Sequence, residues 1–169
     1  MTVIIGVGNP YRRDDGVGPA VVDRLRARDL PGVRLVVSDG EATGLIEAWD
    51  GARLAVVVDA VRAAGPAHPG RVHRLCVYRP PAERGRAASS HGMDMGEAVE
   101  LARLLGRLPD RLVLYAVEAA DVGFGTGLSA PVAAAADRLT DRIADEITAE
   151  NAAENAAETR PVAGAGKEG

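Results

Sequence analysis

The sequence has few cysteine and aromatic residues. Only one of its 169 residues is a cysteine, Cys76, and aromatic residues make up 3% of the chain. A single cysteine excludes an intrachain disulfide and a cysteine-rich metal site. With so few aromatic side chains, the core has to be built from the Val, Leu, Ile and Ala residues that dominate the apolar segments.

Long hydrophobic runs and an excess of basic charge are also absent. The first apolar run, Val3 to Val7, is far shorter than a membrane span, and no basic segment precedes it as in a signal peptide. We therefore expect a cytoplasmic protein without a membrane partner. The formal net charge is −4, whereas proteins that bind a phosphate backbone are usually basic. A nucleic acid is therefore not expected as a partner.

Apolar segments of two kinds alternate along the chain. Short runs predict strands at residues 2–7, 33–38, 53–61, 71–79 and 111–117. Segments with apolar residues at helical spacing predict helices at residues 16–29, 43–50, 92–106 and 129–147. This alternation predicts a three-layer α/β fold, a mostly parallel five-stranded twisted sheet with helices on both faces. The fourth strand follows the third without room for a helix, so we expect it to run antiparallel at an edge.

Several local features refine this prediction. A carboxylate of Asp14 or Asp15 would cap the first helix, and Thr43 would cap the second. Cys76 lies within an apolar run and is predicted to be buried. Residues 151–169 are rich in Ala, Glu and Gly and lack a face to bury, so we expect a disordered tail after a single domain of residues 1–150.

Three polar residues are predicted to lie where the chain leaves or re-enters the sheet. Asp15 follows the first strand, Asp59 closes the run AVVVD, and His91 precedes the third helix. Ligands of open α/β sheets bind beyond the carboxyl ends of the strands, so we expect these side chains to share one cleft. Two carboxylates and one imidazole suit a borderline divalent metal. The alternatives are a helix cap for Asp15 and an ordinary loop histidine for His91, whereas a carboxylate directly after an apolar run is costly to bury without a partner.

The remaining polar candidates fit ordinary structural roles better. His68 and His73 are expected to face solvent, and Asp39 is expected to form a turn before Gly40. Two serines, Ser89 and Ser90, precede His91, but no G-x-S-x-G segment surrounds them, so we interpret them as caps or loop residues.

The first loop, GVGNPYRRDDGVG, also deserves comparison with nucleotide-binding loops. The dinucleotide motif requires a third glycine, and Tyr11 occupies that place. We therefore expect no organic cofactor. The glycines instead allow the backbone to turn sharply off a strand and to approach a bulky partner closely.

This first loop resembles the opening signature of the hydrogenase maturation proteases, endopeptidases that trim the C-terminus of the large subunit of nickel–iron hydrogenases. Further blocks similar to the family follow in the family's order: SDGEATGLIEAWD, VVVDAV, SSHGMDMGEAVELARLLG and LYAVEAADVGFGTGLSAPVAAA. Together they cover nearly all of residues 2–148. One departure is Glu41, which stands where the family often has the second Gly of Asp-Gly-Gly-Thr.

The resemblance implies a function and a site. The chain would be a hydrogenase maturation endopeptidase that removes the C-terminal extension of an immature large subunit. Asp15, Asp59 and His91 match the metal-binding positions of the family and are the expected catalytic residues. By the same resemblance, the metal is the nickel already loaded in the substrate, which these three residues would sense.

Two other functions are compatible with parts of the sequence. The first block also resembles that of bacterial peptidyl-tRNA hydrolases, but Asp14 and Asp15 replace the catalytic His-Asn pair, and the chain lacks a basic stripe. The second alternative is a non-catalytic chaperone that binds nickel or the large subunit. A cleavage assay on a nickel-loaded large subunit distinguishes a protease from such a chaperone.

Overall fold

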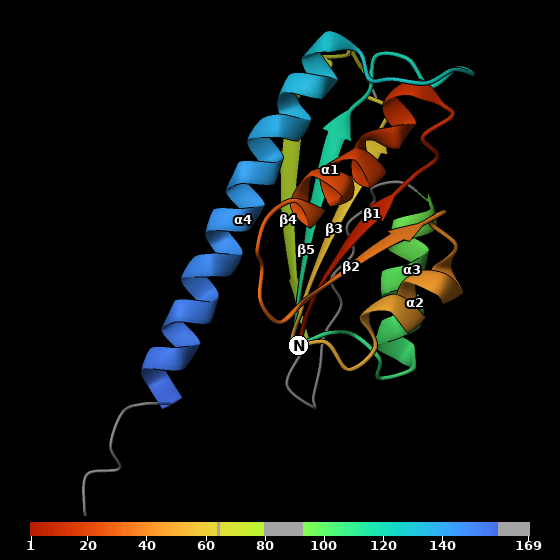
Figure 1. The fold of residues 1–169 in the computed structure, drawn as a ribbon. Helices are drawn as coiled ribbons and strands as arrows, with labels where there is room; N and C mark the ends of the chain where they lie inside the picture. Colours follow the sequence, from red (N-terminus) through yellow and green to blue (C-terminus); the bar gives the residue numbers. More distant parts are fainter. Residues whose placement is uncertain (64, 80–92, 159–169) are drawn as a thin grey trace, which may run out of the picture.

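A five-stranded sheet forms the centre of the fold. The computed structural model describes residues 1–63, 65–79 and 93–158 (Figure 1). Its strands are β1 (Thr2–Val7), β2 (Val33–Ser38), β3 (Leu54–Val61), β4 (Val72–Tyr78) and β5 (Arg111–Glu118). Strand β1 pairs in parallel with β2 and β3, β3 pairs in parallel with β5, and β4 pairs antiparallel with β5 at the edge. The predicted mostly parallel sheet and its antiparallel fourth strand are confirmed.

Helices cover both faces of the sheet (Figure 1). They are α1 (Val17–Arg26), α2 (Ala42–Trp49), α3 (Met93–Leu104) and α4 (Ala130–Glu158). One apolar cluster joins the sheet to α1 and α4, and a second joins it to α2 and α3. Every residue of β1 is buried, because both of its faces are covered. Among the described residues, no helix has the length and apolar content needed to cross a membrane.

Helix α1 lies unusually close to the sheet at its first turn. A Cβ atom added to Gly18 would lie 2.4 Å from the carbonyl oxygen of Val7 and 2.5 Å from that of Val58. Gly6 faces Gly18 across the same contact. The absence of both side chains lets α1 begin directly against the carboxyl ends of β1 and β3. The loop between β1 and α1 is therefore held over this edge of the sheet.

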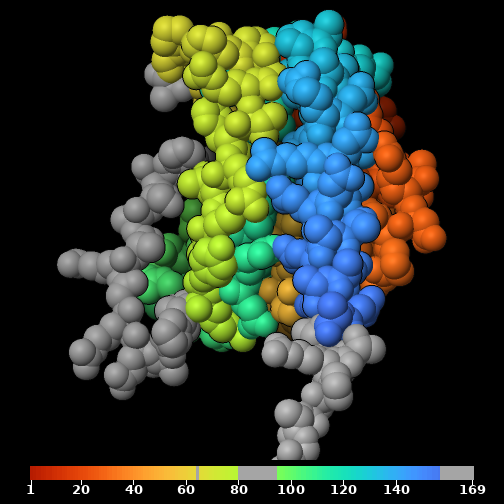
Figure 2. Space-filling view, turned by 90° about the vertical axis from the view of Figure 1, so that its left-hand side faces the viewer, coloured from red at the N-terminus to blue at the C-terminus, as the bar shows by residue number. Residues whose placement is uncertain are grey.

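Strand β4 lies at the surface beside α4, as Figure 2 shows. Its side chains alternate between half-buried residues such as Leu75 and Val77 and exposed ones such as Cys76. The prediction that Cys76 is buried is therefore wrong. An edge strand can be covered on one face only, so an apolar sequence does not ensure that both faces are buried.

The start of α2 and the end of α4 also differ from the sequence prediction. Thr43 lies inside α2, whose N-cap is Glu41 and lacks a side-chain cap bond. The turn before α2 is fixed by the carboxylate of Asp39, which accepts a 3.1 Å hydrogen bond from the backbone N–H of Glu41. This contact agrees with the turn predicted at Asp39.

Helix α4 continues past Ile147 to Glu158. Ala and Glu favour helix, and the added turns reach partners on the body of the protein. Arg53 forms a salt bridge with Glu154 at 2.7 Å, and Asn151 donates a hydrogen bond to the carbonyl oxygen of Pro31. The first part of the predicted tail is thus helical, and residues 159–169 lie outside the described part of the chain.

Candidate functional site

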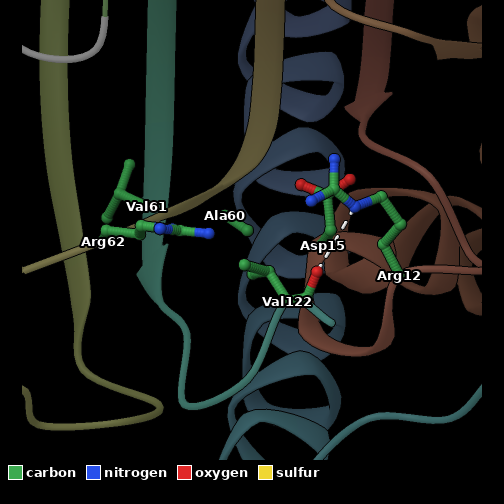
Figure 3. A pocket seen from close by; sticks show the side chains of 6 residues that line it. All are labelled: Arg12, Asp15, Ala60, Val61, Arg62 and Val122. Carbon is green, nitrogen blue, oxygen red and sulfur yellow. Dashed lines mark hydrogen bonds between the residues drawn. The ribbon is translucent and has the colours of Figure 1, made fainter. Parts of the chain in front are cut away.

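A cavity of about 210 Å³ opens at the carboxyl edge of the sheet (Figure 3). It is lined by Arg12, Asp15, Ala60, Val61, Arg62 and Val122. These residues come from the loop after β1, from the end of β3 and from the loop after β5. The carboxyl ends of three neighbouring parallel strands therefore build the cavity, which is the expected place for a ligand in an open α/β sheet.

Asp15 is the only acidic residue among the residues that line this cavity in the described structure. Its carboxylate accepts a hydrogen bond of 2.9 Å from the backbone N–H of Asn9. Gly8 has a φ of +129°, and a Cβ added to it would lie 1.8 Å from the carbonyl oxygen of Asp15. The turn that positions Asp15 thus requires glycine at residue 8.

Asp14, the neighbouring acid, is fully buried, and its carboxylate binds the loop between β5 and α4. The prediction that Asp14 or Asp15 caps α1 is wrong. The N-cap of α1 is Gly16, and no side chain forms a cap hydrogen bond there. The Asp14 carboxylate instead accepts hydrogen bonds from the backbone N–H groups of Ala120 (2.8 Å) and Asp121 (3.1 Å). It also accepts the N–H (2.7 Å) and the hydroxyl (2.9 Å) of Ser129, the residue before α4.

These hydrogen bonds set the charge state of Asp14. Burial raises the pKa of the carboxyl group, but the donors of Ser129, Asp121 and Ala120 outweigh this effect and leave the pKa below its ordinary value. Asp14 is therefore a negative charge that is compensated by the loop between β5 and α4.

The loops after β1 and β5 are also joined through their backbones. Gly125 donates its N–H to the carbonyl oxygen of Tyr11 at 2.9 Å, and Arg13 donates its N–H to the carbonyl oxygen of Gly125 at 3.0 Å. These two bonds form a parallel bridge between Arg12 and Gly125. The Nε–H of Arg12 adds a 3.3 Å bond to the carbonyl oxygen of Val122, drawn dashed in Figure 3.

Asp59 lies at the same edge of the sheet as Asp15. It pairs with Ala116 in the β3–β5 register and is half-buried. Asp59 directly precedes Ala60, Val61 and Arg62, but it does not itself line the cavity. Side chains alternate between the two faces of a strand, so Asp59 lies on the same face of β3 as Val57. Val57 packs in the apolar cluster that joins the sheet to α2 and α3.

His91, together with Ser89 and Ser90, lies outside the described residues. Within the described ranges, no three His, Cys, Asp or Glu side chains are close enough together to hold a metal ion. A common site for Asp15, Asp59 and His91 therefore stays a prediction.

The other two histidines lie near Glu118, at the end of β5. His68 is exposed, as predicted. The His73 ring, by contrast, is only partly exposed, and its Nε2 lies 2.8 Å from the Glu118 carboxylate. The backbone N–H of His68 and the His73 ring lower the pKa of Glu118. These contacts join β4 to β5, and none of the three residues lines the cavity.

Sequence reasoning missed Arg12, Arg62 and Val122 as residues of the site. Arg12 and Arg62 are two of many arginines in the sequence, and Val122 lies more than a hundred residues from Asp15 in the chain. Nothing in a single sequence indicates that the loop after β5 lies against the loop after β1.

Comparison with known proteins identifies the family. A family model described as hydrogenase maturation protease (HycI) matches residues 19–146, which is most of the chain. This region includes Asp59 and begins after Asp15. A search of curated proteins found no match.

Solved structures of hydrogenase maturation proteases have a similar fold. The hydrogenase maturating endopeptidase HybD from E. coli is 23% identical, with a TM-score of 0.66 over 84% of this chain and 88% of that one. The hydrogenase maturation protease HycI from Thermococcus kodakarensis is 25% identical, with a TM-score of 0.61 over 87% of this chain and 92% of that one. A hydrogenase 2 maturation peptidase from a Thaumarchaeota archaeon is 23% identical, with a TM-score of 0.61 over 86% of this chain and 97% of that one.

With the family model spanning most of the chain and the same fold in these structures, the chain belongs to the hydrogenase maturation protease family and is an endopeptidase.

Proposed function

We propose that this chain removes the C-terminal extension of a nickel-loaded large subunit of a nickel–iron hydrogenase. In this proposal Asp15, Asp59 and His91 bind the nickel that the substrate already carries. The observation that carries the proposal is that Asp15 lines the cavity at the carboxyl edge of the sheet. The chain belongs to a family of hydrogenase maturation proteases, for which a cavity at this place is a suitable active site. Asp59 directly precedes three other residues of the same cavity.

The chemistry of the proposed ligands fits nickel. Imidazole and carboxylate groups both bind divalent nickel, and three protein ligands leave coordination positions for groups of the substrate. Nickel is here part of the substrate and not a resident cofactor. No organic cofactor is proposed.

The charges around the cavity favour an ion that arrives with its own ligands. Arg12 and Arg62 line the cavity together with Asp15, so positive charge stands beside the proposed ligand. A free cation would be repelled by these guanidinium groups. A nickel ion whose charge is already compensated by anionic ligands of the large subunit would be repelled less.

Hydrolysis of the peptide bond requires an activated water and a polarised carbonyl group. Among the described residues that line the cavity there is no Ser or Cys, so no hydroxyl or thiol nucleophile of these two types lies there. The two aspartates are the groups that can take the proton of the water or hold the ion that polarises the carbonyl. Each route needs a carboxylate at the residue that takes the proton or binds the ion.

A cleavage assay with three substrates tests this function. The purified protein is incubated with a nickel-loaded large subunit, with the nickel-free form and with an unrelated peptide. We expect shortening of the nickel-loaded form alone, detected on a gel and by the mass of the released peptide. Efficient processing of the nickel-free form would falsify nickel sensing. Binding of the large subunit without any cleavage would instead support the chaperone alternative.

Variants test the site itself. We expect Asp59→Ala and His91→Ala to abolish processing while the far-UV circular dichroism and the melting temperature stay close to wild type. Asp110→Ala is the matched control. Asp110 is an exposed aspartate directly before β5, at the amino ends of the parallel strands and thus opposite the cavity. Full processing by the Asp59→Ala protein would show that Asp59 is not part of the active site.

A further inference from the structure

Two of the five aromatic residues of this chain are exposed on the loops that contribute Arg12 and Val122 to the cavity. Tyr11 is 70% exposed, and Phe124, the only phenylalanine, is 91% exposed. In contrast, Trp49 and Tyr115 are fully buried in the two apolar clusters. An aromatic side chain gains most of its binding energy when it is removed from water, so an exposed one is unused in the free protein.

The bridge between the two loops brings these aromatic residues together. Tyr11 and Phe124 each precede one member of the bridged pair, Arg12 and Gly125. Tyr11 and Phe124 therefore lie on the two segments that this bridge joins. Arg12 also lines the cavity, and Val122, two residues before Phe124, lines it too. Both aromatic residues therefore lie within two positions of a residue that lines the cavity.

The segments that carry this pair are held firmly. Asp14 binds both ends of the loop between β5 and α4, through Ala120 and Ser129. A salt bridge of 3.2 Å between Arg13 and Asp121 adds a further connection between the loops. A loop that is already held in place loses less conformational entropy on binding, which makes its residues effective anchors.

We propose that Tyr11 and Phe124 form an aromatic rim that contacts the hydrogenase large subunit beside the bond to be cut. This inference rests on the proposed function and assigns part of its substrate recognition to two residues. The large subunit is the expected occupant because it has to cover the mouth of the cavity for its nickel to reach Asp15. A second copy of this chain seated on the aromatic rim would obstruct that approach.

Steady-state cleavage of the nickel-loaded large subunit by Tyr11→Ala, Phe124→Ala and the double variant tests the aromatic rim. Tyr78→Ala is the matched control. Tyr78 is 64% exposed and pairs with Arg111, the first residue of β5, at the end of the sheet opposite the cavity. We expect the KM to rise about tenfold for each single variant, as for aromatic residues that anchor an interface. The kcat at saturation, the melting temperature and the Tyr78→Ala protein should stay close to wild type.

The outcomes separate this inference from the proposed function. If the wild-type protein cleaves and the rim variants behave like Tyr78→Ala, the aromatic rim is overturned and the function stands. If the wild-type protein binds the large subunit without cleaving it, the proposed function fails, and a tenfold weaker Kd of the variants still supports the rim. If the wild-type protein neither cleaves nor binds the large subunit, both fail. A wild-type dimer that Phe124→Ala dissociates without any change in KM would assign the rim to a contact between copies and overturn the proposal.

Discussion

At the scale of single residues, Asp14 and Asp15 lie in opposite environments although they are neighbours in the chain. Asp14 is buried and accepts four hydrogen bonds from the loop between β5 and α4. Asp15 is half-buried, lines the cavity and, among the described residues, accepts one hydrogen bond, from the backbone N–H of Asn9. The first acid therefore stabilises the site, and the second is available to a substrate.

Substitution of the two acids should separate these roles. In Asp14→Asn, an amide NH₂ group replaces one oxygen and faces N–H donors, so we expect the free energy of unfolding to fall by about 2–4 kcal/mol. Asp15→Asn should change it by less than about 1 kcal/mol, because the side chain keeps an oxygen toward Asn9. Asp15→Asn should nevertheless lose processing. Urea unfolding and the cleavage assay measure both effects, and equal destabilisation by the two changes would contradict these roles.

The sequence predicts the chemistry of these residues better than their partners. Asp15 follows the first predicted strand, which is a local property of the sequence and is also found in the structure. The role of Asp14 depends on Ala120, Asp121 and Ser129, which lie more than a hundred positions away. A helix cap is the nearest local explanation for such an acid, and only the folded chain shows that its carboxylate bonds elsewhere.

At the scale of secondary-structure elements, the contact of α1 with the sheet positions the site. Gly18 lies where α1 meets the carbonyl groups of Val7 and Val58. Any side chain there would push the start of α1, and with it the loop that carries Asp15, away from the sheet edge.

Two glycine-to-alanine changes in helices test this contact. Gly18→Ala places a Cβ within 2.5 Å of backbone oxygens, so we expect a loss of several kcal/mol in the free energy of unfolding and reduced processing. Gly44→Ala, within α2, meets nothing within 4 Å and should stabilise the protein by about 0.5–1 kcal/mol. Thermal and urea unfolding measure the difference. Similar melting temperatures for the two variants would show that α1 can move outward at little cost.

Element types and order follow from the sequence because apolar periodicity reports how an element is covered. Strand β2 begins and ends where the sequence predicts, between turn residues on either side. The errors concern surfaces and ends. Whether Cys76 is buried depends on which face of an edge strand carries a helix, and the length of α4 depends on Arg53 and Pro31, which are distant in the chain.

At the scale of the whole molecule, the last turns of α4 contribute little to the folded body. A chain that ends at Asn151 loses the salt bridge between Arg53 and Glu154, both of which are substantially exposed. Such surface pairs contribute at most about 1 kcal/mol. We expect this truncated protein to keep its melting temperature within a few degrees and to process substrate normally. A loss of many degrees, measured by calorimetry, would show that residues beyond Asn151 pack on the body.

Acid should weaken the fold through its bonded carboxylates. Burial raises the pKa of Asp14 and of Glu146, but hydrogen bonds outweigh it and leave both below the ordinary values of 3.8 and 4.5. A lowered pKa in the folded state means stability that is complete above the ordinary pKa and lost as pH falls through the folded value. We expect the melting temperature to fall below about pH 4, and less steeply in Asp14→Asn. Parallel curves for the two proteins would exclude Asp14 as a source of the acid sensitivity.

The anchoring of the two loops by Asp14 has a consequence for how this family can diversify. The bonds that join the loops use backbone groups of Tyr11 and Gly125 and the buried carboxylate of Asp14. The exposed side chains of Tyr11 and Phe124 take no part in them. Residues at these two positions can therefore be exchanged during evolution, or by an engineer, without a change of architecture. On the proposed recognition by the aromatic rim, such an exchange would change which large subunit is bound while the residues of the cavity stay in place.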